Sequence, residues 1–131
     1  MDAAWPVARV RFARPTDRLP EVLQFYEDGL GLQRIDSFEN HAGYSGVMLG
    51  LPGGEYHLEL TEHIDGSPGP APTRDNLLVL YLTDRAAISA ISDRLRALSH
   101  EPVKPENPYW ADDLTFEDPD GWCVVLRYVA S

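Results

Sequence analysis

The sequence has little of several features that would assign it to a class at once. It holds a single cysteine, Cys123, so an internal disulfide framework is excluded. No apolar run approaches the roughly 20 residues that a membrane-spanning helix needs. The first residues show no basic region followed by an apolar stretch, which a secretion signal requires. We therefore expect a cytoplasmic protein that has no membrane as its partner.

Basic residues are also scarce. Lys and Arg number 11 against 21 Asp and Glu, which gives a net charge of -10. This charge repels phosphate backbones and anionic lipid surfaces, so it argues against nucleic acid as a partner. The 131 residues, 44% of them hydrophobic, are sufficient for one globular domain. These observations favour a small molecule over nucleic acid or a membrane as the partner.

The first half of the chain has the pattern of one strand, one helix and three more strands. Arginine alternates with apolar residues over 7–14, which predicts a strand. Apolar residues at helical spacing follow a Thr-Asp cap and predict a helix over 17–29. Shorter segments with strand character then lie around 32–38, 43–50 and 55–61.

The second half repeats this order after a segment rich in proline and glycine. Residues 64–76 cannot form a regular element and read as a linker. A buried strand is predicted over 77–83, and Asp84 is placed to cap a second amphipathic helix. A short strand near 101–104 and a hairpin turning at 118–121 complete the pattern.

A short internal repeat supports a duplication. The triplet Thr16-Asp17-Arg18 recurs as Thr83-Asp84-Arg85, each time between a strand and a helix. The sequence therefore predicts an α+β fold of two βαβββ modules, one over about 7–63 and one over about 77–131. The modules are expected to pair into a cupped mixed sheet around a cavity, with the helices outside.

Three segments carry a family resemblance. Residues 25–32 (Phe-Tyr-Glu-Asp-Gly-Leu-Gly-Leu), 58–61 (Leu-Glu-Leu-Thr) and 117–122 (Glu-Asp-Pro-Asp-Gly-Trp) resemble, in the same order, motifs of the vicinal oxygen chelate superfamily. That superfamily includes glyoxalase I, ring-cleaving dioxygenases, fosfomycin-inactivating metalloenzymes and metal-free bleomycin-binding proteins. The resemblance implies the same paired modules, a ligand cavity and a homodimer.

The resemblance also implies where a metal would be held, namely at one residue on the first and last strand of each module. In this sequence those positions fall on Arg9, Glu59, Leu77 and Val125. Only Glu59 can coordinate a metal, because a guanidinium has no free lone pair and Leu and Val have no donor atom. One carboxylate holds a divalent ion weakly. We therefore expect no metal and no other cofactor.

Glu59 has candidate partners on its own strand and across the first module. His57 lies two residues away and points to the same side, so the two side chains form half of a rebuilt metal site, an acid–base pair, or two partly solvated cavity residues. The resemblance places Arg9 opposite Glu59. That pair is expected either to close the former metal position as a salt bridge or to recognise an anion or carbonyl group.

Other candidate ligand contacts lie on the same concave side. Alternation along the strands directs Arg11 and Arg127 toward the cavity. Tyr109 and Trp110 precede the final hairpin, where they would stack on a flat ligand or else cover the core edge or a dimer interface. The candidate ligand-binding residues are therefore Arg9, Arg11, His57, Tyr109, Trp110 and Arg127.

These observations predict a function without deciding its class. We expect metal-independent binding of a small organic molecule in the cavity between the modules, as in bleomycin-binding proteins. One alternative is a glyoxalase-type lyase or isomerase that uses Glu59 as its catalytic base. The other is a structural or regulatory dimer that binds no ligand, and fold alone does not distinguish the three.

Overall fold

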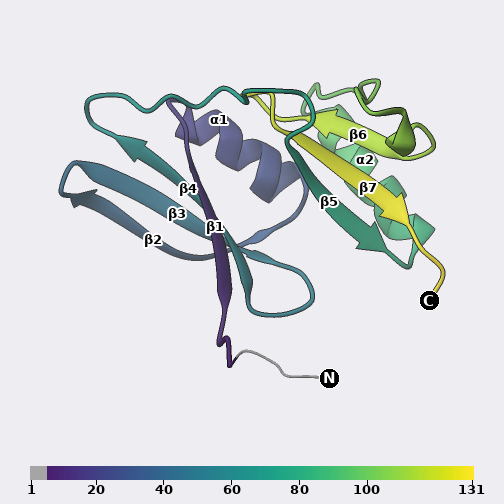
Figure 1. Ribbon diagram of the computed structural model, residues 1–131, viewed down its shortest axis with the longest axis horizontal. Coiled ribbons are helices and arrows are strands. Elements are labelled where there is room, and N and C mark those ends of the chain that lie inside the picture. Colours follow the sequence, from purple (N-terminus) through teal and green to yellow (C-terminus); the bar gives the residue numbers. More distant parts are fainter. Residues whose placement is uncertain (1–5) are drawn as a thin grey trace.

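The computed structural model describes residues 6–131, shown in Figure 1. Most of the N-terminal segment in which a secretion signal was sought lies outside the described residues. The two halves of the chain form two sheets side by side, each with its own helix, and β-strands of the two sheets share no ladder. The predicted α+β class with two similar modules is confirmed. Among the described residues, no helix is long and apolar enough to cross a membrane.

The first module is a sheet of four strands in the order β1-β4-β3-β2. Its strands are β1 (Val10–Pro15), β2 (Gln33–His41), β3 (Tyr44–Leu51) and β4 (Tyr56–His63). Strand β1 runs parallel to β4, and the other neighbours are antiparallel. Helix α1 (Leu19–Leu23) continues into a wider helical turn, η1 (Gln24–Gly29), in which Leu30 N–H donates to the Phe25 carbonyl. This helix packs on one face of the sheet.

The second module has three strands in the order β5-β7-β6. Its elements are β5 (Leu77–Leu82), α2 (Arg85–Ala97), the short helix η2 (Pro108–Trp110), β6 (Leu114–Glu117) and β7 (Cys123–Tyr128). The Asp84 carboxylate accepts a hydrogen bond of 2.9 Å from the Ala86 N–H, so the predicted helix cap is confirmed.

The strand predicted near 101–104 is reduced to a single bridge between Val103 and Thr115. Pro102 and Pro105 flank Val103, and proline has no N–H to donate to a ladder. A longer strand therefore cannot pair here. The predicted strand is therefore wrong beyond this one bridge.

The predicted helix start is also displaced. The Thr16 hydroxyl accepts a hydrogen bond from the Arg18 N–H, but the Asp17 carboxylate accepts from the Ser67 N–H in the linker. Asp17 therefore holds the linker instead of capping the helix. Two further contacts hold the same segment: Trp122 Nε1 donates to the Gly69 carbonyl at 2.9 Å, and the Ala71 N–H donates to the Asp120 carbonyl at 2.9 Å.

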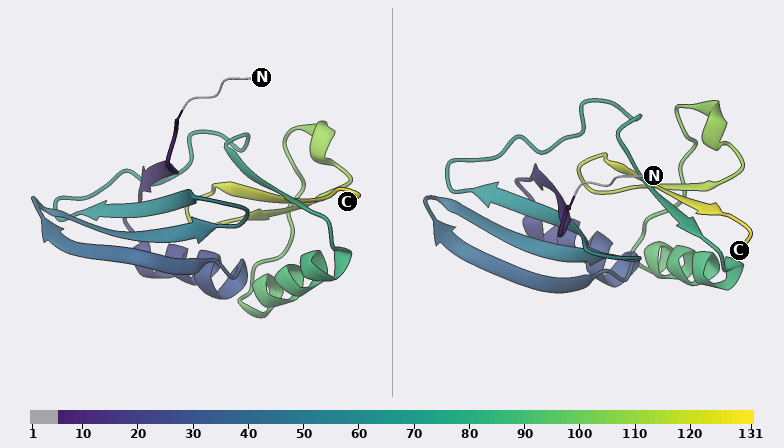
Figure 2. Two further views of the ribbon diagram at one scale, coloured as in Figure 1. Left: turned by 90° about the horizontal axis from the view of Figure 1, so that it is seen from below. Right: turned by 60° about the horizontal axis from the view of Figure 1, so that its bottom comes forward.

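The helices lie on the same side of the two sheets (Figure 2), and α2 packs against η1, the continuation of α1. Gly29 lies against Leu95 of α2, and both are buried. Arg94 of α2 donates to the Gly29 carbonyl at 2.9 Å and to the Leu30 carbonyl at 3.1 Å, which satisfies carbonyls at the end of the first helix. One hydrophobic core, containing side chains from both modules, fills the space between helices and sheets.

Candidate functional site

Three polar side chains share the face of β1 and β4 that is turned away from α1. The register places Arg11 opposite His57 and Ala13 opposite Glu59. Side chains alternate along a strand, so Leu58 and Leu60 point to the other face, where they belong to the core. We call Arg11, His57 and Glu59 the polar cluster.

The ion pair of Glu59 joins it to Arg11, with 3.8 Å between Nη1 and Oε1. The expected Arg9–Glu59 pair was therefore wrong. Arg9 precedes β1, and it borders an exposed depression beside Glu55 and Tyr56. The resemblance placed the first metal position on Arg9, whereas the register brings Arg11, two residues later, toward Glu59.

The polar cluster has hydrogen-bonding capacity that the protein does not use. The Glu59 and His57 side chains are only 13% and 11% exposed. Nδ1 of His57 is buried and has no hydrogen-bond partner among residues 6–131, and its Nε2 lies 3.9 Å from the Glu55 carboxylate. The Arg11–Glu59 separation is also longer than a hydrogen bond. Buried polar groups without partners are costly, so this face favours a molecule that supplies them.

The candidates of the second module form a separate group around Arg127. Its guanidinium donates to Asp113 Oδ2 at 2.9 and 3.1 Å and to the Tyr109 hydroxyl at 3.1 Å. It also lies 4.7 Å from the Tyr109 ring centroid and 4.6 Å from that of Trp110. Hydrogen bonds from Arg127 to Asp113 and Tyr109 raise the pKa of the guanidinium, which stays charged. The two aromatic rings therefore pack on this cation.

The structure thus gathers five of the ligand-binding candidates and Glu59 into two groups, and it leaves Arg9 apart from both. Within residues 6–131, no hydrogen bond or ion pair links the polar cluster with the Arg127 group. The same residues contain no group of three or more His, Cys, Asp or Glu that could hold a metal ion. His57 and Glu59 supply two donors at most, and the Arg11 cation beside Glu59 opposes a second positive charge. The donor set does not fit the metal site of the superfamily.

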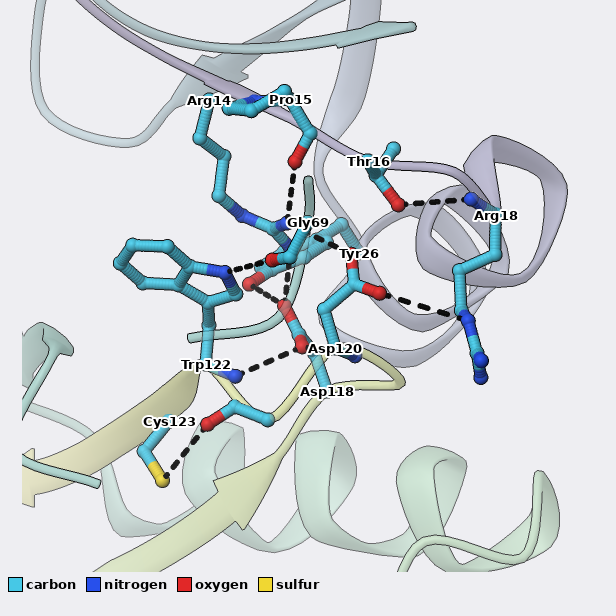
Figure 3. A network of polar contacts seen from close by, with 11 residues as sticks. Arg14, Pro15, Thr16, Arg18, Tyr26, Gly69, Asp118, Asp120, Trp122 and Cys123 are labelled. Carbon is cyan, nitrogen blue, oxygen red and sulfur yellow. Dashed lines mark hydrogen bonds and ion pairs between the residues drawn. The ribbon is translucent and has the colours of Figure 1, made fainter. Parts of the chain in front are cut away.

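Sequence reasoning missed a buried ionic network between the modules, shown in Figure 3. Arg14 of β1 is 4% exposed and forms ion pairs with Asp118 and Asp120 of the turn between β6 and β7. The Tyr26 hydroxyl donates to Asp118 Oδ2 at 2.7 Å, and the Trp122 ring lies 5.2 Å from the Arg14 guanidinium. We call these five residues the inter-module network.

One signal in the sequence pointed to this network. Arg14 continues the face that Val10 and Phe12 occupy on β1, and a charged side chain on such a face needs a buried partner. The role expected for the turn is confirmed as well, because Asp118 Oδ1 accepts from the Asp120 and Trp122 N–H groups at 2.8 and 3.0 Å. Its other oxygen carries the contacts to the first module.

Tyr26 should make stability sensitive to alkaline pH. Burial of its ring and the nearby Asp118 carboxylate raise the pKa of Tyr26 well above its ordinary value of about 10. Above that pH the unfolded chain loses the tyrosine proton and the folded chain keeps it. The free energy of unfolding should therefore fall by up to about 1.4 kcal/mol per pH unit from this group.

Urea unfolding between about pH 9 and 11 measures this decline. The Tyr26→Phe variant should show a shallower decline than the wild type. The Tyr81→Phe variant, in which a 59% exposed ring is changed, should follow the wild type. Parallel curves for the wild type and Tyr26→Phe would contradict the assignment.

The Arg11–Glu59 pair should contribute little to stability. Arg11 is 38% exposed, so Arg11→Ala is expected to cost under about 1 kcal/mol. Arg9→Ala, at an exposed position before the strand, should change stability by less than about 0.5 kcal/mol. Chemical denaturation of both variants, with a double-mutant cycle of Arg11→Met and Glu59→Gln, measures the coupling. A coupling above about 2 kcal/mol would mean that the pair is a buried structural bridge.

The architecture defines the class of protein. Two βαβββ-type modules with both helices on one side, and a Glu-containing polar cluster on the first and last strands of module one, place the chain in the vicinal oxygen chelate superfamily. It belongs to the YycE-like family: the YycE-like N-terminal domain matches residues 10–61, and the YycE-like C-terminal domain matches residues 75–128.

Solved structures and a curated relative support this placement. The uncharacterised YycE protein of Bacillus subtilis is 46% identical over 125 residues, which are 95% of this chain and 90% of that protein. The crystal structure of YycE from Bacillus subtilis, a protein of unknown function grouped with glyoxalase and fosfomycin resistance proteins, has a TM-score of 0.88 and covers 95% of this chain and 91% of its own.

More distant structures share the fold alone. TnmS3, an antibiotic binding protein of a Streptomyces species, is 19% identical with a TM-score of 0.67, covering 97% of this chain and 100% of its own. FosX, a fosfomycin resistance protein of Listeria monocytogenes, is 15% identical with a TM-score of 0.64. The match covers 95% of this chain and 93% of the FosX chain. That FosX structure contains Mn(II) and a dihydroxypropylphosphonic acid.

Proposed function

We propose that the protein binds a small organic molecule at the polar cluster without a metal ion. The observation that carries this proposal is the unused hydrogen-bonding capacity of two mostly buried side chains, His57 and Glu59. A ligand that donates a hydrogen bond to Glu59 and forms a second one with His57 Nδ1 would remove the free-energy cost of leaving these groups without partners. Arg11, 38% exposed, is placed to bind a carbonyl or anionic group of the same molecule.

The second module is proposed to supply secondary contacts. Tyr109 is 65% exposed, and Trp110 and Arg127 hold its ring in a fixed position, so this group offers a preformed surface to a flat ligand. Arg9 is exposed at the rim and is proposed to act only through its charge.

Two comparisons support binding in place of metal chemistry. TnmS3, which has the same fold, binds an antibiotic. The FosX structure holds a manganese ion with its phosphonate ligand, but the Glu59, His57 and Arg11 side chains of this chain do not form a corresponding donor set. A site that uses hydrogen bonds and one cation agrees with the residues present.

Thermal shift assays in buffer with EDTA test this proposal. Bleomycin, fosfomycin and a library of small aromatic carbonyl compounds serve as probes. We expect at least one probe to raise the melting temperature, because a ligand that binds only the folded state stabilises it. The shift should be lost in Glu59→Gln and kept in Glu62→Gln, since Glu62 is on the same strand but alternates onto the other face.

Three outcomes would overturn the proposal. The first is the absence of a shift with every probe, and the second is an equal shift in Glu59→Gln and the wild type. The third is elemental analysis that finds about one metal ion per chain, lost in Glu59→Ala, since one ion per chain would define a metal site.

We also propose that the chain forms a homodimer. Strand β1 is at the edge of its sheet, and its Val10 and Phe12 are 49% and 59% exposed. Tyr56, opposite Val10 on β4, is 49% exposed and extends the apolar surface. Unpaired edges and contiguous apolar surface tend to be covered, and a second copy would cover them. Light scattering at micromolar concentration should give twice the chain mass; a monomer would contradict this.

A further inference from the structure

A cavity of about 140 Å³ lies between the two modules. Phe12 and Arg14 of β1 and Leu58 of β4 border it from the first module, and Leu77, Leu78 and Cys123 border it from the second. The two sheets share no ladder, so the free edges of β1 and β5 are not drawn together by backbone hydrogen bonds. The cavity fills the space that this separation leaves.

This cavity is distinct from the polar cluster. Phe12 and Arg14 alternate with Arg11 along β1, and Leu58 lies between His57 and Glu59 on β4. Successive side chains of a strand point to opposite faces. The cavity is therefore on the side of the first sheet that faces the helices, opposite the face used by the proposed function.

Most of the polar atoms that border the cavity are occupied by other contacts. Asn76 also lines it: its side-chain oxygen accepts from the Thr73 N–H and hydroxyl at 3.1 and 2.7 Å, and its amide nitrogen has no hydrogen-bond partner among residues 6–131. Both terminal nitrogens of Arg14 bind the carboxylates of Asp118 and Asp120. The Tyr26 hydroxyl donates to Asp118, and Trp122 Nε1 donates to the Gly69 carbonyl. These groups present their rings and carbon atoms to the cavity, so its lining is mostly apolar. The same contacts fix the walls, which keeps the volume open without a ligand.

Cys123 is the remaining group with a reactive atom in the lining. Its side chain is buried, and burial together with the nearby Glu117 carboxylate raises the pKa of the thiol. The neutral thiol is a small apolar group and a weak donor. It adds no charge that a ligand would have to match.

We infer that this inter-module cavity is a second binding site, which takes a small neutral ring such as benzene or toluene. An apolar protein cavity of about 150 Å³ is known to stay dry and to bind benzene, so the volume here is sufficient for one six-membered ring. A charged ligand would find no free opposite charge in the lining, because Arg14 is already paired with Asp118 and Asp120, and it would lose its hydration. Phe12, which is 59% exposed, lines the cavity from β1.

Methyl NMR titration of the intact protein with benzene, toluene and cyclohexane tests this inference. The methyl signals of Leu58, Leu77 and Leu78 should shift saturably, while those of Leu114 on β6, which does not line the cavity, should not. Cys123→Met places a larger flexible side chain in the cavity and should weaken binding by about tenfold or more. Cys123→Ser keeps the size of the residue and should retain binding within about twofold.

The outcomes separate this site from the polar cluster. Glu59→Gln should leave ring binding unchanged, so failure of the proposed function would not affect this result. No saturable shift in the wild type, or equal affinity in Cys123→Met, would overturn the inference. A wild-type crystal under xenon pressure gives an independent measurement that does not depend on folding of a variant: xenon density in the cavity supports the site, and its absence contradicts it.

Discussion

Arg14→Ala is expected to lower the free energy of unfolding by about 3–5 kcal/mol, the largest effect of any single substitution considered for this protein. The substitution removes the cation that lies between Asp118 and Asp120, whose side chains are 0% and 3% exposed. Asp118 would then have lost its cation, and Asp120 would keep only the half-exposed Arg18. Burial already raises the pKa of Asp118, and Arg14 offsets part of that effect. Urea unfolding at neutral pH measures the loss.

A matched control is available on the same carboxylate. Arg18 lies 3.6 Å from the other oxygen of Asp120 but is 55% exposed, so Arg18→Ala should cost under about 1 kcal/mol. Combining Arg14→Met with Asp118→Asn and Asp120→Asn removes all three charges and should recover most of the loss. A cost below about 1 kcal/mol for Arg14→Ala would show that the network is solvated in solution.

Gly29→Ala is expected to cost about 2–3 kcal/mol through overpacking where the two helices meet. A Cβ at this position would overlap the side chain of Leu95, which is fully buried in the core. The residue belongs to the segment that suggested the superfamily, and the close approach of α2 explains why glycine is needed there. Thermal and urea unfolding both report the change.

The control for this prediction is a glycine with more room. A Cβ at Gly50 would lie 3.4 Å from Ile35, an ordinary contact, so Gly50→Ala should change stability by less than about 1 kcal/mol. In a Leu95→Ala background the overlap is gone, and Gly29→Ala should then cost much less than in the wild type. An equal cost in both backgrounds would locate the effect elsewhere.

Local patterns predicted most of the fold. The Asp84 cap, the turn at 118–121 and the order of elements in the first half depend on residues near one another in sequence, and each is confirmed. The short strand at 101–104 failed for a local reason too, because Pro102 and Pro105 remove its donors. Such features need no knowledge of how the modules pack.

The candidate site was harder to predict from the sequence, because it depends on the register of the strands and on contacts between residues far apart in the chain. Glu59 was identified from its motif, but its partner is Arg11 and not Arg9, a difference of one side-chain repeat along β1. Arg14 and Asp118 are 104 residues apart in the sequence, so no local sequence pattern predicts their contact. The packing of Tyr109 and Trp110 on Arg127 likewise requires the loop conformation.

The segment between the modules has a consequence for how copies of the chain can assemble. Although residues 64–76 have the composition of a flexible tether, Ser67 is held by Asp17, and Gly69 and Ala71 are held by the 118–122 turn. Exchange of halves between two chains would have to break these contacts and the buried Arg14 ion pairs together. Two copies should therefore meet as complete units, each keeping both of its own halves, and domain swapping should be slow or absent.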